Sequence, residues 1–323
     1  MPLGLRRGLV TALVEAHERL IRLEVDGIAC VAYPWVTGPL EVGDDVLVNE
    51  RARLLELGSG GFDVLYANLT RGLGLPAEEG AHVMALPYTP GQVAVRFDEE
   101  SAEVAESLEG LPVVLCTLHS QVAPACAALS GLRVAYVQVG GGALPVSLSD
   151  TVRELKGRGL VDVACAVAPC LDADAQFVTA AAALAWACAE GYDVVICSVG
   201  PGIVGTASRF GHGALELADV ANAAIALAGR PVLAVRTSGA DARARHRGVS
   251  HHARAVLDFT LGQVVVAAER DGVGWEEACA GLPLSHMGRG PADDPAFFRS
   301  AYAAGVAARR LVPGGGAAPA ARE

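Results

Sequence analysis

The segment with the sequence ARARHRGVSHHARAVLD, residues 242–258, concentrates side chains that can do chemistry. It holds four arginines and three of the eight histidines of a chain whose formal net charge is −11. Guanidinium groups match carboxylate and phosphate oxygens, and histidine acts as an acid, a base or a metal ligand near neutral pH. The segment therefore predicts a site for a small anionic ligand. The residues expected to hold the anion here are Arg243, Arg245, His246 and Arg247.

Two adjacent histidines in this segment are the candidate acid–base groups. Gly248 should interrupt any helix, and Ser250 is a favoured N-cap, so that His251 and His252 fall in a first helical turn. The positive end of the helix dipole disfavours a protonated imidazole there and attracts an anion. We expect His251, His252 and the nearby Asp241 to be catalytic. If a metal is bound, the same three are the expected ligands, although no HExxH or structural-zinc spacing occurs.

The arginines have an alternative explanation. Six arginines lie between Arg230 and Arg254, with Asp241 as the one acidic residue among them. They could pair with acidic side chains of a partner subunit or face solvent. A homo-oligomer therefore stays open, alongside direct contacts with a ligand.

Apolar runs alternate with helical patterns after Leu111, which indicates a mostly parallel sheet covered on both faces. Strands are expected at 112–117, 132–138, 162–167, 193–198, 231–236 and 263–267, and helices at 121–129, 149–157, 174–189, 213–228, 250–261 and 294–310. In such sheets, ligands bind outside the carboxyl ends of the strands.

Glycine-rich or short polar loops follow five of these strands, which predicts a ligand crevice. His119 is a further candidate catalytic residue there, and Ser208, Arg209 and His212 could face the same crevice. The candidate ligand-binding residues in these loops are Gly141, Gly200, Gly202, Gly205, Thr206 and Ser238.

The segment GPGIVG, residues 200–205, matches the letters of a dinucleotide fingerprint. The match is weak, because Pro201 removes one backbone donor and the next helix begins late. A general anion-binding loop and a loop that only permits close packing both remain open. An NADP-dependent oxidoreductase, with Arg236 near the 2′-phosphate, stays an alternative, and the cofactor is left unknown.

Short strands with regular turn signals over residues 7–70 predict a small antiparallel β-barrel. The expected organisation is a barrel domain over 1–75, a connection over 76–110, a Rossmann-like α/β domain over 111–311 and a disordered tail over 312–323. The fold class is α/β: an N-terminal small antiparallel barrel followed by a mostly parallel, Rossmann-like α/β sandwich.

Composition narrows the partners. The sequence pI is about 5.2 and no long basic run occurs, which argues against nucleic acid. The apolar stretch 178–189 is too short to span a bilayer, so no membrane partner is expected. The eight cysteines lack C-x-x-C spacing and several lie in apolar runs. A reduced, cytoplasmic location is expected, with no signal peptide.

Several long motifs resemble one bacterial family. They are VGPGIVGTASRFG, DARARHRGVSHHARAVL and HMGRGPADDPAFF, in this order, with LHSQVAP and QVGGGALPVSLSDTV before them. The chain resembles, over nearly its whole length, the domain of unknown function 3866 family, which is found mainly in Gram-positive lineages. Where that family favours Gly-Thr, this chain has Thr206-Ala207-Ser208. The resemblance implies a family unit and no activity.

The residues predict an enzyme of transferase or hydrolase type that acts on a small phosphorylated or carboxylated metabolite. A ligand-binding regulatory protein without turnover is the second hypothesis, and the oxidoreductase is the third.

Overall fold

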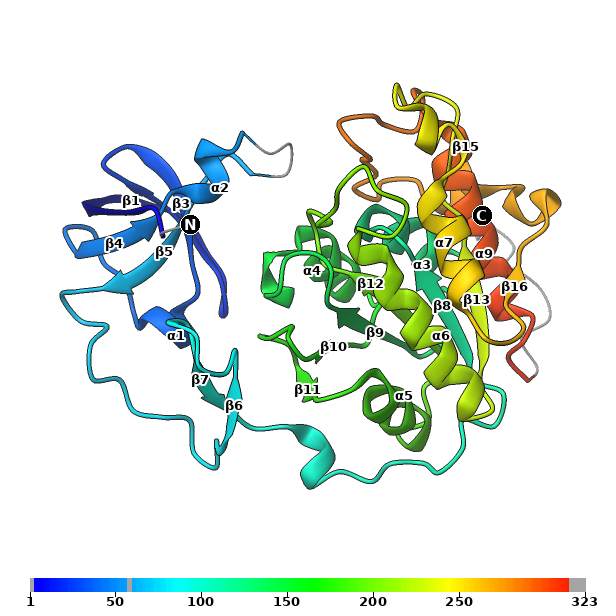
Figure 1. Ribbon diagram of the computed structural model, residues 1–323, viewed down its shortest axis with the longest axis horizontal. Coiled ribbons are helices and arrows are strands. Elements are labelled where there is room, and N and C mark those ends of the chain that lie inside the picture. Colours follow the sequence, from blue (N-terminus) through cyan, green and yellow to red (C-terminus); the bar gives the residue numbers. More distant parts are fainter. Residues whose placement is uncertain (1–2, 57–59, 314–323) are drawn as a thin grey trace. The chain divides into compact units, whose positions relative to one another are not determined.

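The computed structural model describes residues 3–56 and 60–313, and the chain forms two compact units, Met1–Arg96 and Phe97–Glu323 (Figure 1). The boundary falls inside the stretch expected to connect two domains. Most of the expected C-terminal tail, residues 314–323, lies outside the described residues.

The first unit contains a closed five-stranded barrel, in the order β1-β2-β3-β5-β4. A two-stranded sheet follows in the stretch expected as a connection. The strands of this unit are β1 (Leu5–Ala16), β2 (Ile21–Val25), β3 (Ile28–Ala32), β4 (Asp45–Asn49), β5 (Asp63–Asn68), β6 (Val83–Ala85) and β7 (Val93–Val95), and its short helices are α1 (Pro34–Thr37) and α2 (Arg51–Leu54).

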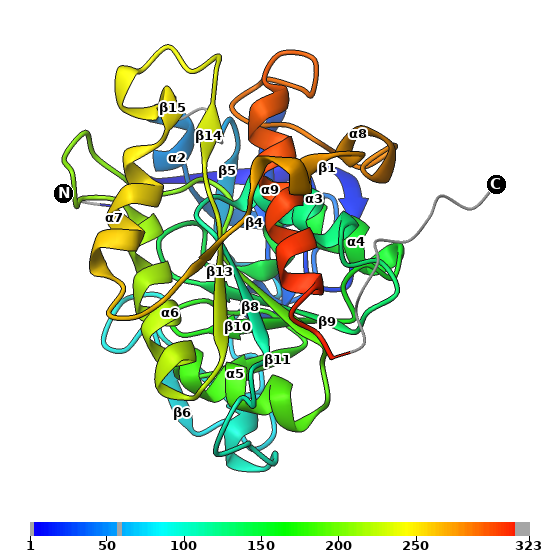
Figure 2. The same ribbon diagram turned by 90° about the vertical axis from the view of Figure 1, so that its right-hand side faces the viewer.

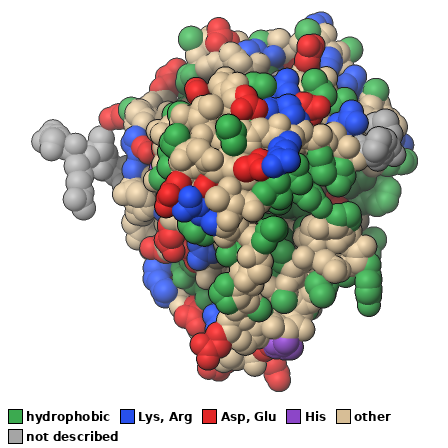
Figure 3. All heavy atoms as spheres, turned by 90° about the vertical axis from the view of Figure 1, so that its left-hand side faces the viewer, with side chains coloured by type: hydrophobic (Ala, Val, Ile, Leu, Met, Phe, Trp, Pro, Cys, Tyr) green, Lys and Arg blue, Asp and Glu red, His purple; other side chains and the backbone are tan. Residues whose placement is uncertain are grey.

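All strand pairs of the barrel are antiparallel except β3 and β5, which pair in parallel. Asp26 and Gly27 join β2 to β3 with positive φ angles of 53° and 74°. A two-residue hairpin turn needs this backbone, and Asp-Gly supplies it. On the face seen in Figure 3, basic and acidic side chains lie interspersed, with exposed hydrophobic side chains among them.

The second unit contains a seven-stranded parallel sheet in the order β11-β10-β9-β12-β8-β13-β16, which confirms the α/β fold class. Its strands are β8 (Pro112–Cys116), β9 (Val134–Val139), β10 (Val163–Val167), β11 (Ala175–Phe177), β12 (Val194–Val199), β13 (Arg230–Ala234) and β16 (Val265–Val266). A separate pair, β14 (Thr237–Ser238) and β15 (Gly248–Val249), follows β13.

Two hydrophobic layers bury the two faces of this sheet. Alternating residues of β8 divide between them: Val113 and Leu115 pack in one layer, and Val114 and Cys116 in the other. The first layer includes α5 (Ala180–Ala189), α6 (Glu216–Ala226) and α7 (His251–Phe259), and the second includes α3 (Val122–Ala127), α4 (Asp150–Gly157) and α9 (Pro295–Arg309). Figure 2 shows β8 and β13 between α6 and α7 on one side and α9 on the other. The short α8 (Trp275–Ala278) packs against α9.

The expectation of one helix over 174–189 was wrong at its start. Residues 175–177 pair with β10 as the edge strand β11, and α5 begins at Ala180 after Thr179, whose hydroxyl accepts a hydrogen bond from the amide of Ala182 at 3.2 Å. Apart from Asp174, Gln176 and Thr179 the stretch is apolar, so periodicity could not separate a short strand from a helix.

The connections that follow the neighbouring strands β9 and β12 run toward opposite sides of the sheet. From β9 the chain runs by way of α4 to β10 on one side, and from β12 it runs by way of α6 to β13 on the other. A crevice outside the carboxyl ends of the strands is expected at such a switch point. All the candidate site residues follow the carboxyl ends of β8, β9, β12 or β13.

Candidate functional site

The arginine–histidine segment folds as its glycine and serine predict. Gly248 has a φ of +66° and lies in β15, which pairs with β14. Ser250 is the N-cap of α7 and accepts a hydrogen bond from the amide of His252 at 3.2 Å. His251 and His252 therefore occupy the first turn of α7, as expected.

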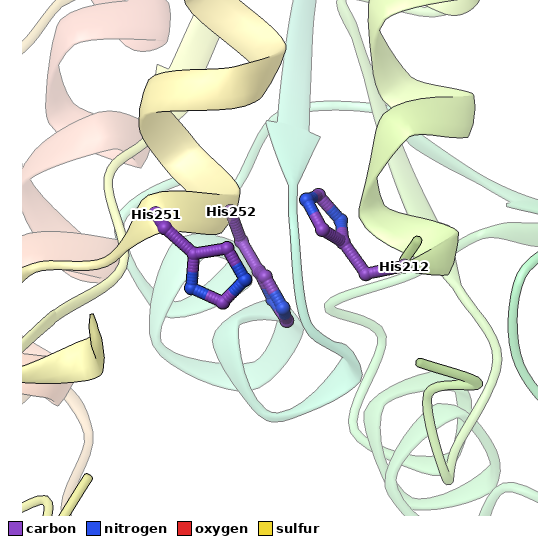
Figure 4. A group of neighbouring side chains, drawn as sticks. All are labelled: His212, His251 and His252. Carbon is purple, nitrogen blue, oxygen red and sulfur yellow. The ribbon is translucent and has the colours of Figure 1, made fainter. Parts of the chain in front are cut away.

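Four histidine rings meet here. The ring of His212 stacks on that of His252 with centroids 4.1 Å apart, and His251 lies 4.4 Å from His252. His246 completes the group at 4.8 Å from His251. Figure 4 shows His251 and His252 on the start of α7, with His212 reaching them from the loop before α6. The sequence placed His212 only as a residue that could face the crevice.

Asp241 is a shared partner of three arginines. It accepts hydrogen bonds at 3.0 Å from the Nε and Nη2 atoms of Arg243. Arg236 lies 3.3 Å and Arg289 3.5 Å from its Oδ2 atom. Burial would raise the pKa of Asp241, but the hydrogen bonds and charge of Arg243 outweigh burial and hold this pKa well below its usual range. Asp241 is thus a fixed negative charge, a poor acceptor for a substrate proton.

Positive charge nevertheless exceeds negative charge in this network of arginines and carboxylates. Asp294 is the second acidic residue: it accepts from the Ser238 hydroxyl and lies 3.5 Å from Arg289. Arg236 is 2 % exposed, and burial lowers its pKa to about 10. Two carboxylates, those of Asp241 and Asp294, therefore pair with three guanidinium groups. One positive charge among Arg236, Arg243 and Arg289 is left in excess.

Unsatisfied polar atoms gather in the same place. Six buried side-chain nitrogens here have no hydrogen-bond partner in the described part of the chain: Nδ1 of His212, Nε2 of His251, Nε2 of His286, Nε of Arg236, and Nε and Nη2 of Arg289. Buried polar groups are normally paired, so orphans of this kind point to a ligand or ion that completes the site.

The histidines are held neutral. Burial, followed by the charge of nearby histidines and arginines, lowers the pKa of His252 to about 2. Burial and then the charges of Arg236 and Arg243 lower the pKa of His246 to about 3. The pKa values of His212 and His251 are also lowered, mainly by burial. Neutral imidazoles can accept a proton or bind a metal.

The structure gathers the expected metal ligands differently. Potential ligand atoms of His212, His251 and His252 all lie within 4.8 Å of one another. Asp241, named with the two adjacent histidines, is not in this group, and His212 takes its place. The remaining arginines, Arg245 and Arg247, are exposed beside this group.

His119 belongs to a different hydrogen-bonded group. Its Nε2 atom lies 2.6 Å from the hydroxyl of Ser149, and its Nδ1 atom lies 3.4 Å from the hydroxyl of Tyr136. Burial lowers its pKa to about 4. Ser149 is also the N-cap of α4, so its hydroxyl has a local structural role. No described hydrogen bond joins His119 to the histidine group around His252.

The glycine-containing loops after β9 and β12 pack closely against each other, and glycine is required at their contacts. A Cβ atom on Gly141 would lie 2.5 Å from the carbonyl oxygen of Gly213, and one on Gly200 would lie 2.1 Å from that of Ala143. Gly202 is exposed with a φ of +69°. Gly205 forms an isolated bridge with His212, and the Thr206 amide donates to the Gly211 carbonyl. The loop thus positions His212, and part of its backbone is already paired.

Three residues of this region were missed as site residues. His286, Arg289 and Asp294 precede or begin α9, and Asp294 fixes Ser238 and Gly239 by hydrogen bonds. Arg289 stood out in the sequence only by its flanking glycines.

A cavity of about 300 Å³ lies nearby between α5 and α6, lined in part by Thr179, Glu216 and Asp219. Burial and then Asp219 raise the pKa of Glu216. These acidic side chains do not suit an anion, so the arginine-rich group remains the candidate site.

Comparison with known proteins leaves the activity open. No curated protein matches the chain. Among the described residues, no helix combines the length and the apolar character needed to cross a membrane.

One family match covers most of the chain. The family described as "Protein of unknown function (DUF3866)" matches residues 29–272. This span includes the glycine loop and the arginine–histidine segment, whereas HMGRGPADDPAFF lies beyond its end. The chain belongs to the DUF3866 family of proteins of unknown function.

Proposed function

We propose that this protein is an enzyme of transferase or hydrolase type that acts on a small phosphorylated or carboxylated metabolite at the carboxyl ends of β12 and β13. The buried Nε atom of Arg236, which has no hydrogen-bond partner among the described residues, and the weakly paired Nε and Nη2 atoms of Arg289, each 3.5 Å from a carboxylate, carry the proposal together with the excess of positive charge. An anion supplies acceptors for these donors, and each charge-assisted hydrogen bond is worth about 1.5–3 kcal/mol.

The neutral histidines give this site a means of catalysis. Nδ1 of His212 and Nε2 of His251 are buried lone pairs without a donor, and such atoms can take a proton from a substrate hydroxyl or water. Arg245 and Arg247, exposed at the edge of the site, would meet the incoming anion. A binding protein without turnover needs the arginines and gives no role to these lone pairs.

The oxidoreductase alternative has less support. The amides of Val204 and Thr206 in the glycine loop already donate to backbone carbonyls.

Thermal unfolding in phosphate, sulfate and small carboxylates, with a chelator present, tests the anion site. A specific site predicts a saturable rise in the melting temperature with one anion, and a loss of that rise in the Arg245→Ala, Arg247→Ala double variant. The matched control is Arg158→Ala, Arg230→Ala, two arginines at the opposite edge of the sheet, which should respond as the parent does. If all salts act alike in every variant, the anion site does not exist.

Turnover is tested separately. Small molecules that co-purify with the protein are identified by mass spectrometry and offered as substrates. His251→Ala should abolish turnover while ligand binding is retained. Equal turnover in this variant would favour the binding-protein alternative.

A further inference from the structure

We infer that His212, His251 and His252 form a binding site for a divalent transition-metal ion of the zinc class. The inference deepens the proposed function, on which it rests for the role of the metal. Its first support is geometric: one ligand atom from each ring lies within 4.8 Å of the others, and two elements far apart in sequence bring the rings together.

The rings of His212 and His251 each contact a backbone carbonyl, as the rings of metal-bound histidines commonly do. Nε2 of His212 lies 3.1 Å from the carbonyl of Arg209, and Nδ1 of His251 lies 3.4 Å from the carbonyl of Arg245. Each of these nitrogens must donate, because a carbonyl only accepts. The opposite nitrogens, Nδ1 of His212 and Nε2 of His251, therefore carry lone pairs. Metal-bound histidines characteristically donate their second N–H to a backbone carbonyl in this way.

Those lone pairs are buried and unused. Both nitrogens lack a hydrogen-bond partner within the described residues, and His212 is only 6 % exposed. A donor-free imidazole nitrogen inside a protein is costly unless a proton donor or a metal meets it. A metal ion suits both atoms at once.

His252 enters the site with the opposite arrangement. Arg236 Nη1 lies 3.2 Å from its Nδ1, and a guanidinium can only donate, so the proton of this ring is on Nε2. His252 becomes a ligand only when that proton leaves or the Arg236 contact is exchanged. Its share of the metal affinity should therefore be the smallest of the three.

The ligand set favours zinc-like ions over calcium or magnesium. Three imidazoles suit zinc, copper, iron or nickel, whereas calcium and magnesium require oxygen ligands. Three protein ligands also leave a position open for water or a substrate oxygen, as in catalytic zinc sites. In tetrahedral zinc sites the ligand nitrogens are roughly 3.3 Å apart, so the rings must draw together when the metal binds.

The surrounding arginines make the metal and the anion interdependent. Arg236, Arg243 and Arg245 act on His251 through their positive charge, and the same charges oppose a metal dication. An anion bound to the arginines removes that repulsion. Inorganic phosphate should therefore raise the zinc affinity, and zinc should raise the phosphate affinity by the same factor.

Calorimetric titration of zinc chloride into the metal-free, full-length protein without a polyhistidine tag tests the site. One zinc per chain is expected, with tighter binding when phosphate is present below the solubility limit of zinc phosphate. Absence of stoichiometric zinc binding, with and without phosphate, would overturn the inference.

Three variants each remove one imidazole ring while keeping the neighbouring hydrogen bond. His212→Gln retains a donor for the Arg209 carbonyl, His251→Asn retains a donor for the Arg245 carbonyl, and His252→Asn retains an acceptor for Arg236. The first two should weaken zinc binding at least about tenfold, and His252→Asn by less. The control is His17→Gln, a histidine of the barrel unit that pairs with Glu15, which should bind zinc as the parent does.

Affinities equal to the parent in both His212→Gln and His251→Asn would overturn the inference, as would an equal loss in His17→Gln. Circular dichroism establishes that each variant is folded, and the parent titration decides the question if one is not. The anion experiment above is done in chelator. If it fails while zinc binding is intact, the proposed function is contradicted and the metal site is not.

Discussion

The ring of His212 stacks on the ring of His252 at a centroid distance of 4.1 Å and an interplanar angle of 27°. This contact joins the loop after β12 to the first turn of α7. The segments that follow β12 and β13 therefore contribute to a single cluster of histidine rings.

Replacement of Asp241 should be strongly destabilising. Asp241→Ala leaves Arg236 buried without its carboxylate, and removal of one partner from a buried ion pair costs about 3–5 kcal/mol. We expect the free energy of unfolding, measured with urea, to fall by roughly that amount. Phosphate should restore part of the loss if an anion can take the place of the carboxylate.

The control for that variant is Asp258→Asn, which breaks the exposed pair with Arg209. Exposed pairs contribute about 0–1 kcal/mol, so its stability should be nearly that of the parent. Similar losses in both variants would show that Asp241 is not the centre of the buried network.

Alanine variants of two glycines with similar φ angles should distinguish the cost of a steric clash from the cost of backbone strain. Gly141 has a φ of +97° and Gly131 a φ of +82°. A Cβ on Gly141 would collide with Gly213, whereas one on Gly131 meets nothing within 4 Å. Both alanine variants suffer the left-handed backbone, at a cost of about 1–2 kcal/mol. Gly141→Ala should lose about 1–3 kcal/mol more, as measured by chemical unfolding; equal losses would contradict the close approach of the two loops.

Acid should destabilise the second unit. Burial, and then the charges of Arg236 and Arg289, lower the pKa of His286 to about 4. Between pH 6.5 and 4 the unfolded chain therefore binds a proton that the folded chain does not. The free energy of unfolding should fall as the pH is lowered through this window, by on the order of 3 kcal/mol for this histidine alone.

Urea unfolding at several pH values, in chelator, checks this expectation. His286→Gln should reduce the pH dependence by the share of this one histidine, while His17→Gln, in the barrel unit, should leave it as in the parent. A parent protein equally stable at pH 4 and pH 6.5 would be incompatible with a neutral, buried His286.

The cysteines should differ in reactivity. All eight are free, and Cys188 is the one that is not fully buried. Burial raises the pKa of Cys30, Cys170 and Cys279 to about 12, and a thiol reagent attacks the thiolate. We expect a disulfide reagent at pH 8 to modify about one thiol in the folded protein and all eight in urea. Cys188→Ser should abolish the labelling of the folded protein. Rapid labelling of several thiols before unfolding would rule out the buried arrangement.

Features that depend only on neighbouring residues could be predicted from the sequence. Gly248 and Ser250 fixed the break and the start of α7 because backbone freedom and N-capping act within a few residues. The apolar runs likewise predicted the parallel strands, and the parallel direction placed the loops at one edge of the sheet.

The contacts between side chains and strands from distant segments became visible only in the folded structure. Nothing local in the sequence indicates that His212 stacks on His252, that Arg289 and Asp294 join Asp241 and Ser238, or that β3 meets β5 in parallel to close the barrel. These contacts join segments distant in the chain, and the packing of the sheet and its helices brings them together. The stretch 174–189 shows the same limit: its apolar residues suit a helix or a buried strand, and pairing with β10 made residues 175–177 a strand.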